Sequence, residues 1–197
     1  MTGVPHAGSL VVSDWHRCPD SKEYFSKILH KKRRKRFGIE TTVVYWPVKL
    51  RESGRVLFFR LQLWDCGENA LRRFDHLLPS CKDQVDAVLF LFSFTDRTSF
   101  DDLSNQITKW TESSAGCVKV VVGTKFDLFM HCDVSGREVR DFQEKWSLPV
   151  LRTGGEVTDV LGDVAPILNC LSENLWHQDC VTAGSLSRPS QPETTAL

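Results

Sequence analysis

The sequence has little that would assign it to a functional class by composition alone. Its 25 basic and 25 acidic residues cancel, which excludes a chain that coats nucleic acid in bulk and points to no partner. No apolar run reaches the roughly 18 residues needed to cross a bilayer. The amino terminus lacks a basic segment followed by an apolar one. We therefore expect a protein that is neither secreted nor membrane-spanning.

Cysteine and metal-ligand patterns are also sparse. The seven cysteines are odd in number and form no C-x-x-C pair, which argues against zinc and dithiol motifs and favours a reducing, cytosolic setting. The nearest ligand cluster is His131, Cys132 and Asp133, but three adjacent side chains cannot all turn toward one ion. We therefore expect no metal site. No cysteine stands four residues from the end, so we expect no prenyl anchor.

The most informative absence is a phosphate-binding loop. The pattern G-x-x-x-x-G-K-[ST] uses glycines so that backbone N–H groups converge on phosphates, and a lysine that reaches the outer oxygens. The pattern occurs nowhere in the 197 residues.

The sequence does contain the alternation of strands and helices that is typical of a parallel α/β sheet. With 41% apolar residues, the chain suits one soluble domain. β-branched and aromatic residues predict an antiparallel hairpin, and unbroken apolar runs predict buried parallel strands. The expected strands are 41–46, 56–64, 87–94, 118–122 and 148–151, and the expected helices are 70–78, 100–110, 136–146 and 160–176.

A run of six cations, residues 31–36, follows an amino-terminal helical pattern. The pattern starts after Ser13 and Asp14 and extends to Leu29. Because adjacent cations repel one another, we expect the run to face solvent at the helix end, unless it binds nucleic acid, lipid headgroups or a nuclear-import receptor.

Three polar loops follow expected strands. They span residues 65–68, 95–100 and 123–127. In open α/β sheets, ligands bind outside the carboxyl ends of the strands, so these loops are the candidate binding segments.

These segments resemble those of a known family. Residues 86–100 resemble the fourth strand and following turn of Rab and Ras small GTPases. Four separated signatures resemble, in the same order, the Rab- and Rem-like small GTPases of the ciliogenesis and planar polarity effector complex; they are residues 64–68, 92–97, 124–127 and 175–179. The resemblance covers roughly residues 9–182. It implies the P-loop NTPase fold, with a parallel sheet and one antiparallel hairpin.

The same resemblance implies a biological setting. It indicates roles in cilium assembly, planar cell polarity, targeted membrane trafficking and exocytosis. GTP or GDP with magnesium would be the cofactors, and Inturned and Fuzzy would be among the partners. The expected location is the cytoplasm, at the basal body of the cilium and the cytoskeleton.

Three residues match the family's guanine-recognition motif. Asp127 stands where a carboxylate accepts hydrogen bonds from guanine N1 and N2, because a carboxylate offers acceptors only. Lys125 would lay its aliphatic stem along the purine and brace the phosphate loop. Thr124 replaces the usual asparagine, and its hydroxyl has a shorter reach. Taken alone, the tetrapeptide is also compatible with an ordinary polar turn.

The second switch of the family is only partly present. Asp65 and Gly67 match its magnesium-linked aspartate and its glycine, but one residue separates them where the family has two. Glu68 stands in place of the glutamine that orients the attacking water. We therefore expect no catalytic residue and slow hydrolysis at best.

The family's first strand, phosphate loop and first helix have no counterpart. Only residues 37–40 separate the basic run from the hairpin, and a βαβ unit takes about 30 residues. We expect an amino-terminal extension over 1–37, an incomplete small-GTPase-like domain over 38–180 and a disordered tail over 181–197. The abrupt join near Phe37 and Gly38 suggests an internal block omitted by splicing or by an incorrect gene model.

The missing strand is the central one of the sheet. Either another segment fills its place, or the sheet splits, or the chain is unstable, because two buried strands lose their backbone partners.

Three functional hypotheses remain. One is a GTP-dependent switch, and the second is a nucleotide-independent module that docks on partners through the hairpin and the following helix. The apolar residues expected on that docking surface are Phe58, Trp64, Leu71 and Phe74, although each would equally suit a core. The third is nucleic-acid binding through residues 31–36, for which the rest of the chain offers no groove-reading motif.

Overall fold

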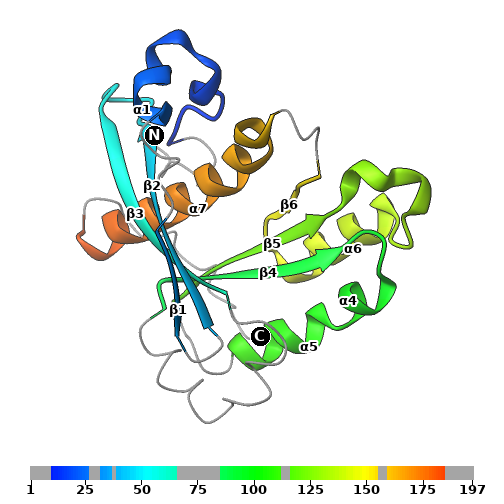
Figure 1. Ribbon diagram of the computed structural model, residues 1–197. Helices are drawn as coiled ribbons and strands as arrows, with labels where there is room; N and C mark the ends of the chain where they lie inside the picture. The colour runs from blue at the N-terminus through cyan, green and yellow to red at the C-terminus, as the bar shows by residue number, and fades with distance from the viewer. Residues whose placement is uncertain are drawn as a thin grey trace, which may run out of the picture.

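The computed structural model describes residues 10–26, 32–36, 39–65, 85–111, 116–154 and 159–184. Its described strands form two three-stranded sheets, one antiparallel in the order β1-β2-β3 and one parallel in the order β4-β5-β6. Figure 1 shows the sheets crossing, with the long helix α7 beside both. The predicted parallel α/β sheet with an antiparallel hairpin is confirmed.

The hairpin consists of β2 (Ile39–Lys49) and β3 (Val56–Asp65), joined by a turn. Alternate side chains point to opposite faces of a strand, and on one face Trp46, Val48 and Leu61 are buried. Large aromatic side chains on the other face stay exposed. This difference between the two faces agrees with the antiparallel hairpin that the sequence predicts.

The basic run was predicted wrongly as a helix end. Lys32–Arg36 forms strand β1, which pairs antiparallel with β2. The amino-terminal helix is short: two 3-10 turns, Trp15–Arg17 and Pro19–Ser21, lead into α1 (Lys22–Ser26). A strand at the edge of a sheet satisfies its backbone through its one neighbour, and strand alternation distributes the cationic positions between both faces instead of crowding them.

The parallel sheet contains β4 (Ala87–Ser93), β5 (Val118–Thr124) and β6 (Val150–Arg152). One of its faces packs against helices α4 (Arg97–Asp101), α5 (Leu103–Thr111) and α6 (Gly136–Trp146). The buried core on this side consists of Phe90, Phe92, Phe94, Phe100, Leu103, Ile107, Val121, Val134, Val139 and Phe142. The expected strands 87–94 and 118–122 and the expected helix 136–146 are found here. The single helix expected over 100–110 is instead two helices, α4 and α5, and the strand expected over 148–151 is β6 at Val150–Arg152.

Helix α7 (Val160–Thr182) packs against β2 of one sheet and β5 of the other. Its residues Ala165 and Leu171 are 0% and 3% exposed. They share one apolar cluster with Trp46 of the hairpin and with Leu89 of β4. The helix is therefore the element that joins the two sheets. It continues to Thr182, beyond the position at which a disordered tail was expected.

Two buried polar side chains of α7 hold the chain around it. The carboxylate of Glu173 accepts hydrogen bonds from the backbone N–H groups of Leu10 and Val11. The side-chain oxygen of Asn169 accepts a 2.9 Å bond from the indole N–H of Trp46. These bonds fix the amino-terminal segment and the hairpin on the same helix.

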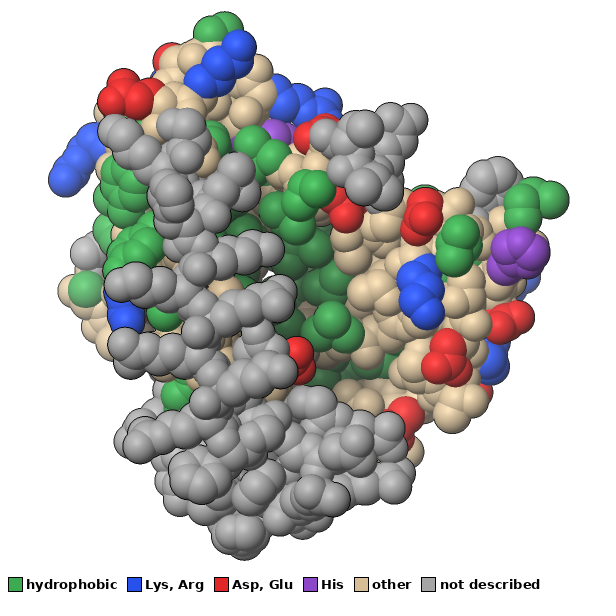
Figure 2. Space-filling view, in the orientation of Figure 1, with side chains coloured by type: hydrophobic (Ala, Val, Ile, Leu, Met, Phe, Trp, Pro, Cys, Tyr) green, Lys and Arg blue, Asp and Glu red, His purple; other side chains and the backbone are tan. Residues whose placement is uncertain are grey.

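The sheet splits where the family's first strand is missing. Among the described residues, β3 pairs only with β2, and β4 pairs only with β5. Leu91 of β4 is 57% exposed although its neighbours Phe90 and Phe92 are buried. Figure 2 shows a hollow lined by apolar side chains between the two halves of the molecule. Of the three outcomes expected for the missing strand, the split sheet is the one that the described residues show.

We expect Glu173→Ala to destabilise the protein by about 1–3 kcal/mol, because the buried N–H of Val11 and the part-buried N–H of Leu10 would lose their acceptor. For a domain of this size each 1 kcal/mol corresponds to about 2–4 °C in Tm. Asp179→Ala removes an exposed acid from the same helix and is the control. Equal melting temperatures for the two variants would contradict the role assigned to Glu173.

A second prediction concerns the ion pair between Arg97 and Glu138, which links α4 to α6. The pKa of Glu138 is lowered to about 2, chiefly because Arg97 donates to its carboxylate and also because Ser135 does. A lowered folded-state pKa means that the stabilisation is present above the ordinary value of 4.5 and is lost as pH falls toward 2.

We therefore expect the wild-type protein to have a higher Tm than the Glu138→Gln variant at neutral pH. This difference in Tm should vanish by about pH 2. Glu144→Gln, an exposed position on the same helix, controls for loss of a carboxylate. A difference that persists unchanged in acid would show that the ion pair is not its cause.

Candidate functional site

The candidate site lies where the three parallel strands end. β4, β5 and β6 run in the same direction, so their carboxyl ends and the loops that follow meet at one edge of the sheet. Backbone hydrogen bonds join these loops. The N–H of Phe94 donates to Thr124, and the N–H of Thr153 donates to Gly123.

The tetrapeptide proposed to read guanine forms a tight turn at the end of β5. Thr124 is the last residue of the strand, and its hydroxyl donates a 2.9 Å hydrogen bond to the carbonyl of Phe92. The hydroxyl thus ties the loop to β4. Lys125 has a φ of +58°, which is uncommon for a residue with a side chain, and both Lys125 and Asp127 are exposed. Their side chains are accessible to a ligand.

Sequence reasoning missed the loop after β6, which supports this turn. Gly154 has a φ of +121°, and a Cβ at that position would lie 2.6 Å from the backbone nitrogen of Phe126 and against the carboxylate of Asp127. Only glycine allows this approach. Asp163 of α7 accepts the Gly154 N–H at 3.0 Å and also accepts from the hydroxyl of Thr153. Two adjacent glycines, Gly154 and Gly155, were the signal in the sequence that could have indicated this loop.

The Phe126 side chain of the turn contacts an aromatic ring and a cation. The Phe94 and Phe126 rings meet edge to face with centroids 4.9 Å apart. The guanidinium carbon of Arg152 lies 4.6 Å from the centre of the Phe126 ring, within range of a cation–π interaction. Phe126 begins the 3-10 segment η4 (Phe126–His131). These contacts anchor the one apolar residue of the tetrapeptide.

The loop of residues 95–100 has a structural role. Asp96 accepts hydrogen bonds from the N–H groups of Thr98 and Ser99 and so caps helix α4. Its carboxylate is engaged by its own helix. This candidate binding loop therefore supports the fold.

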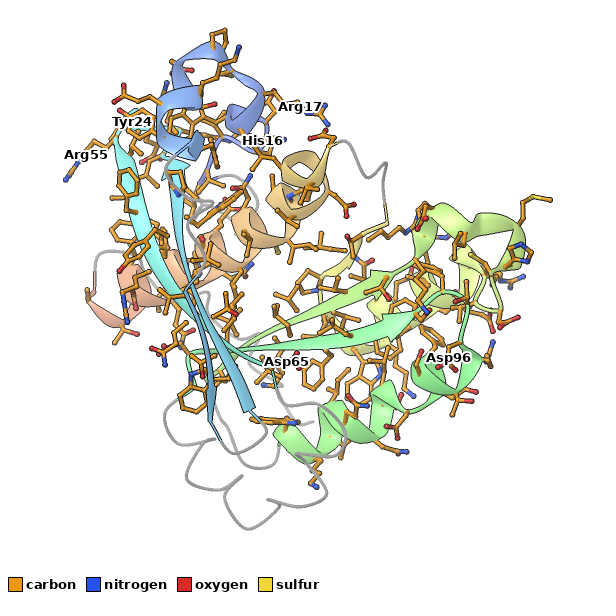
Figure 3. The ribbon with its side chains drawn as sticks, viewed as in Figure 1. His16, Arg17, Tyr24, Arg55, Asp65 and Asp96 are labelled. Atoms are coloured by element: carbon orange, nitrogen blue, oxygen red, sulfur yellow. The ribbon has the colours of Figure 1, made fainter. Side chains whose placement is uncertain are left out.

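Asp65 does not join the site. It is the last residue of β3, opposite Glu40 in the hairpin, and is exposed. Figure 3 shows Asp65 below the crossing of the two sheets and Asp96 at the far end of β4. Gly67 and the expected helix 70–78, with Leu71 and Phe74, lie outside the described residues. The structure thus brings together Thr124, Lys125 and Asp127, and places Asp65 apart from them.

A guanine nucleotide would fit this site only in part. The exposed carboxylate of Asp127 offers the acceptors that a guanine base requires. The phosphates would need convergent N–H groups and a lysine from a glycine-rich loop that the sequence does not contain. The residues expected to contact the base are therefore exposed, whereas the sequence lacks the loop that would contact the phosphates.

The described ranges contain neither a metal-binding cluster nor a membrane-spanning helix. No three His, Cys, Asp or Glu side chains gather there closely enough to bind a metal ion. None of the helices in those ranges combines the length and apolar character that crossing a bilayer requires.

Comparison with protein families is decisive for classification. The model of the Ras family matches residues 27–161, which is more than half of the chain. The chain belongs to the Ras family. The match covers both sheets and includes the turn of residues 124–127.

Similar curated proteins place the chain in one branch of the Ras family. It is 56% identical over 231 residues to ciliogenesis and planar polarity effector 2 of Danio rerio, covering 91% of this chain and 92% of that protein. It is 40% identical over 257 residues to the protein of that name in Mus musculus, covering 98% and 99%. A more distant relative, Ras-related protein Rab-27B of Bos taurus, is 30% identical over 104 residues, or 51% of this chain and 46% of that one.

The lengths of these matches are informative. A match over 231 residues is longer than the chain itself, which has 197. The Danio rerio relative therefore carries residues that have no counterpart here. This agrees with a Ras-family chain that lacks an internal block.

We expect Gly154→Ala to destabilise the protein by about 1–3 kcal/mol, since its Cβ would meet the turn of residues 124–127 at an unfavourable φ. The amide of Phe126, which donates to Thr153, should also exchange its hydrogen faster. Gly54→Ala is the matched control, because Gly54 has a φ of +63° and no atom within 4 Å of the position that the new methyl group would occupy. Equal losses at both glycines would show that backbone strain alone, and not contact with the turn, explains the effect.

Proposed function

We propose that this Ras-family chain serves ciliogenesis and planar cell polarity as a component of an effector complex and docks on its partners without nucleotide. The names of the Danio rerio and Mus musculus relatives support the biological setting. Within that setting we propose Inturned and Fuzzy as partners, targeted membrane trafficking and exocytosis as the process, and the cytoplasm around the basal body and cytoskeleton as the location.

One observation carries the nucleotide-independent reading. The turn with Asp127 is intact and exposed, but Asp65 stands apart from it and no phosphate-binding loop exists in the sequence. The phosphates carry most of the charge of a nucleotide, and charged groups make the strongest hydrogen bonds. A site that contacts only the base therefore lacks the strongest contacts with the nucleotide. Magnesium, which bridges phosphate oxygens in this family, would lose its main ligands for the same reason.

A GTP-dependent switch is the second candidate. The exposed side chains of Lys125 and Asp127, with Gly154 beside them, favour it. This reading requires affinity for GDP with magnesium, and a ligand that binds the folded state raises Tm as its concentration exceeds Kd.

We expect the purified chain to capture Inturned and Fuzzy equally with GDP, with a non-hydrolysable GTP analogue, and after nucleotide removal by a chelator. Asp127→Ala should capture both partners as wild type does, because the proposal assigns no nucleotide to docking. Calorimetry with GDP and magnesium, and melting with and without GDP, should detect no binding. Nucleotide-dependent capture together with a GDP-induced rise in Tm would instead establish the switch.

A further inference from the structure

Strand β4 lies at an edge of the parallel sheet. It pairs with β5 on one side and with no described strand on the other, and Figure 1 shows it as the outermost of the three parallel strands. An edge strand can pair with a strand of another molecule, and proteins usually prevent this with charged residues or proline. The sequence of β4, Ala-Val-Leu-Phe-Leu-Phe-Ser, contains neither. Its composition therefore does not oppose such pairing.

The other edge strands in the described part of the chain all carry charge. β1 consists of five cations, β3 contains Arg60 and Asp65, and β6 is three residues long and ends at Arg152. Charged side chains at an edge disfavour the approach of a second strand, because they would lose water on pairing. Among the described edge strands, β4 is thus the one on which pairing would bury no charged side chain of its own.

The hydrogen bonds of β4 show which of its backbone groups face the open edge. The N–H of Phe94 donates to the carbonyl of Thr124, and the carbonyl of Asp86 accepts from the N–H of Val118. Backbone groups of successive residues in a strand point to opposite sides, so the even positions from 86 to 94 bond toward β5. The odd positions 87, 89 and 91 therefore direct their N–H and C=O groups away from β5.

The open part of this edge ends at Leu91. At the next odd position, the N–H of Ser93 donates to the hydroxyl of Ser99 at 2.9 Å, and the carbonyl of Ser93 accepts from the N–H of Asp96. The turn into α4 thus occupies the backbone groups of position 93. The side chain of Leu91 is 57% exposed beside this open edge.

We propose that two copies of the chain dimerise by antiparallel pairing of their β4 strands about a twofold axis at Leu89. Such an axis places Leu89 opposite Leu89 of the second copy, and Leu91 opposite Ala87 of the second copy. Each opposed pair exchanges two N–H···O=C hydrogen bonds, because all three positions direct their backbone groups to the open edge. The interface is self-complementary, and it closes with two copies.

The side chains favour the same register. Directly opposed side chains lie on one face of a sheet about 5 Å apart, so a large residue is best placed opposite a small one. The exposed Leu91 would lie opposite the methyl group of Ala87 of the second copy. Pairing would therefore cover Leu91 on both copies without crowding, and the apolar Leu89 would contact its own counterpart.

Charge favours a second copy over a partner selected by electrostatics. The chain carries 25 basic and 25 acidic residues, so two copies do not repel each other through net charge. The uncharged strand has no ionic group with which to select a partner of opposite charge. Symmetric pairing instead provides a hydrogen-bonding partner for every backbone group at positions 87, 89 and 91.

The first test needs no variant. The full chain is studied by sedimentation velocity at concentrations from about 1 µM to about 100 µM. We expect a monomer at the lowest concentration and a dimer fraction that grows with concentration and stops at two copies. A monomer throughout the range, or growth beyond two copies, overturns the proposal.

The second test places a charge on the open edge. Leu91→Lys should weaken dimerisation about tenfold or more, because the ammonium group would lose water against the second copy. Met130→Lys makes the same change at a side chain of η4 that is 78% exposed, and it should dimerise as wild type does. Each variant is melted first, and both should unfold near the wild-type temperature. Equal dimerisation of the two variants contradicts pairing through β4.

The third test separates backbone pairing from contact between side chains. Leu91→Pro removes an N–H that faces the open edge, a position at which a strand tolerates proline, and should weaken dimerisation about tenfold or more. Leu91→Thr also removes the leucine side chain but keeps the N–H, and should weaken dimerisation less. Equal losses would show that the side chain alone matters and would overturn strand pairing.

Hydrogen exchange of the wild-type chain reports the pairing directly. The amides of Leu89 and Leu91 should exchange more slowly at about 100 µM than at about 1 µM, because pairing would bond them to the second copy. The amide of Phe90, which points toward β5, should exchange equally at both concentrations. Slowing that is confined to other segments would locate the dimer interface elsewhere and overturn the proposal.

A strand of another protein is the alternative occupant of this edge. If the chain stays monomeric while Leu91→Lys, but not Met130→Lys, reduces capture of Inturned and Fuzzy, the edge of β4 binds one of those proteins instead of a second copy. That result overturns the dimer. It does not depend on whether docking on the complex requires nucleotide, so the two proposals can fail separately.

Discussion

Burial of one face of α7 against both sheets is the interaction on which the rest of the structure depends. With the central strand missing, no backbone ladder connects the antiparallel and parallel halves within the described residues. The apolar cluster around Ala165 and Leu171 replaces that ladder with side-chain packing, which is non-directional and tolerates a change in the angle between sheets. Glu173 and Asn169 then add direction, because their hydrogen bonds specify where the amino-terminal segment and Trp46 must lie.

The division of the sheet also separates the two functions that a nucleotide site combines. The residues expected to recognise a base follow the end of β5, beside the end of β6, and these strands belong to the parallel half. In this family, magnesium and phosphate contacts come from the end of the hairpin and from the loop before it. Here Asp65 ends strand β3, which belongs to the other sheet. The turn of residues 124–127 is held by its own hydrogen bonds to β4 and to the residue after β6.

Much of this was predictable because the relevant signals are local. The apolar runs of β4 and β5 and the capping box formed by Ser135 and Glu138 at the start of α6 are legible in sequence. The basic strand was not, since six cations in a row carry no apolar period and the pairing of Arg34 with Thr41 is set by the hairpin. The support that Gly154 and Arg152 give to the turn was missed because those contacts join segments more than 20 residues apart.

The basic composition of β1 has a consequence for self-association. A strand at the edge of a sheet presents unpaired N–H and C=O groups, which can template pairing with the same strand of another molecule. Two copies of β1 brought together would place ten cations along one seam, and their repulsion would oppose the pairing. Among the described strands β1 is an edge strand of its sheet, and its composition discourages copies of the chain from growing into a fibre.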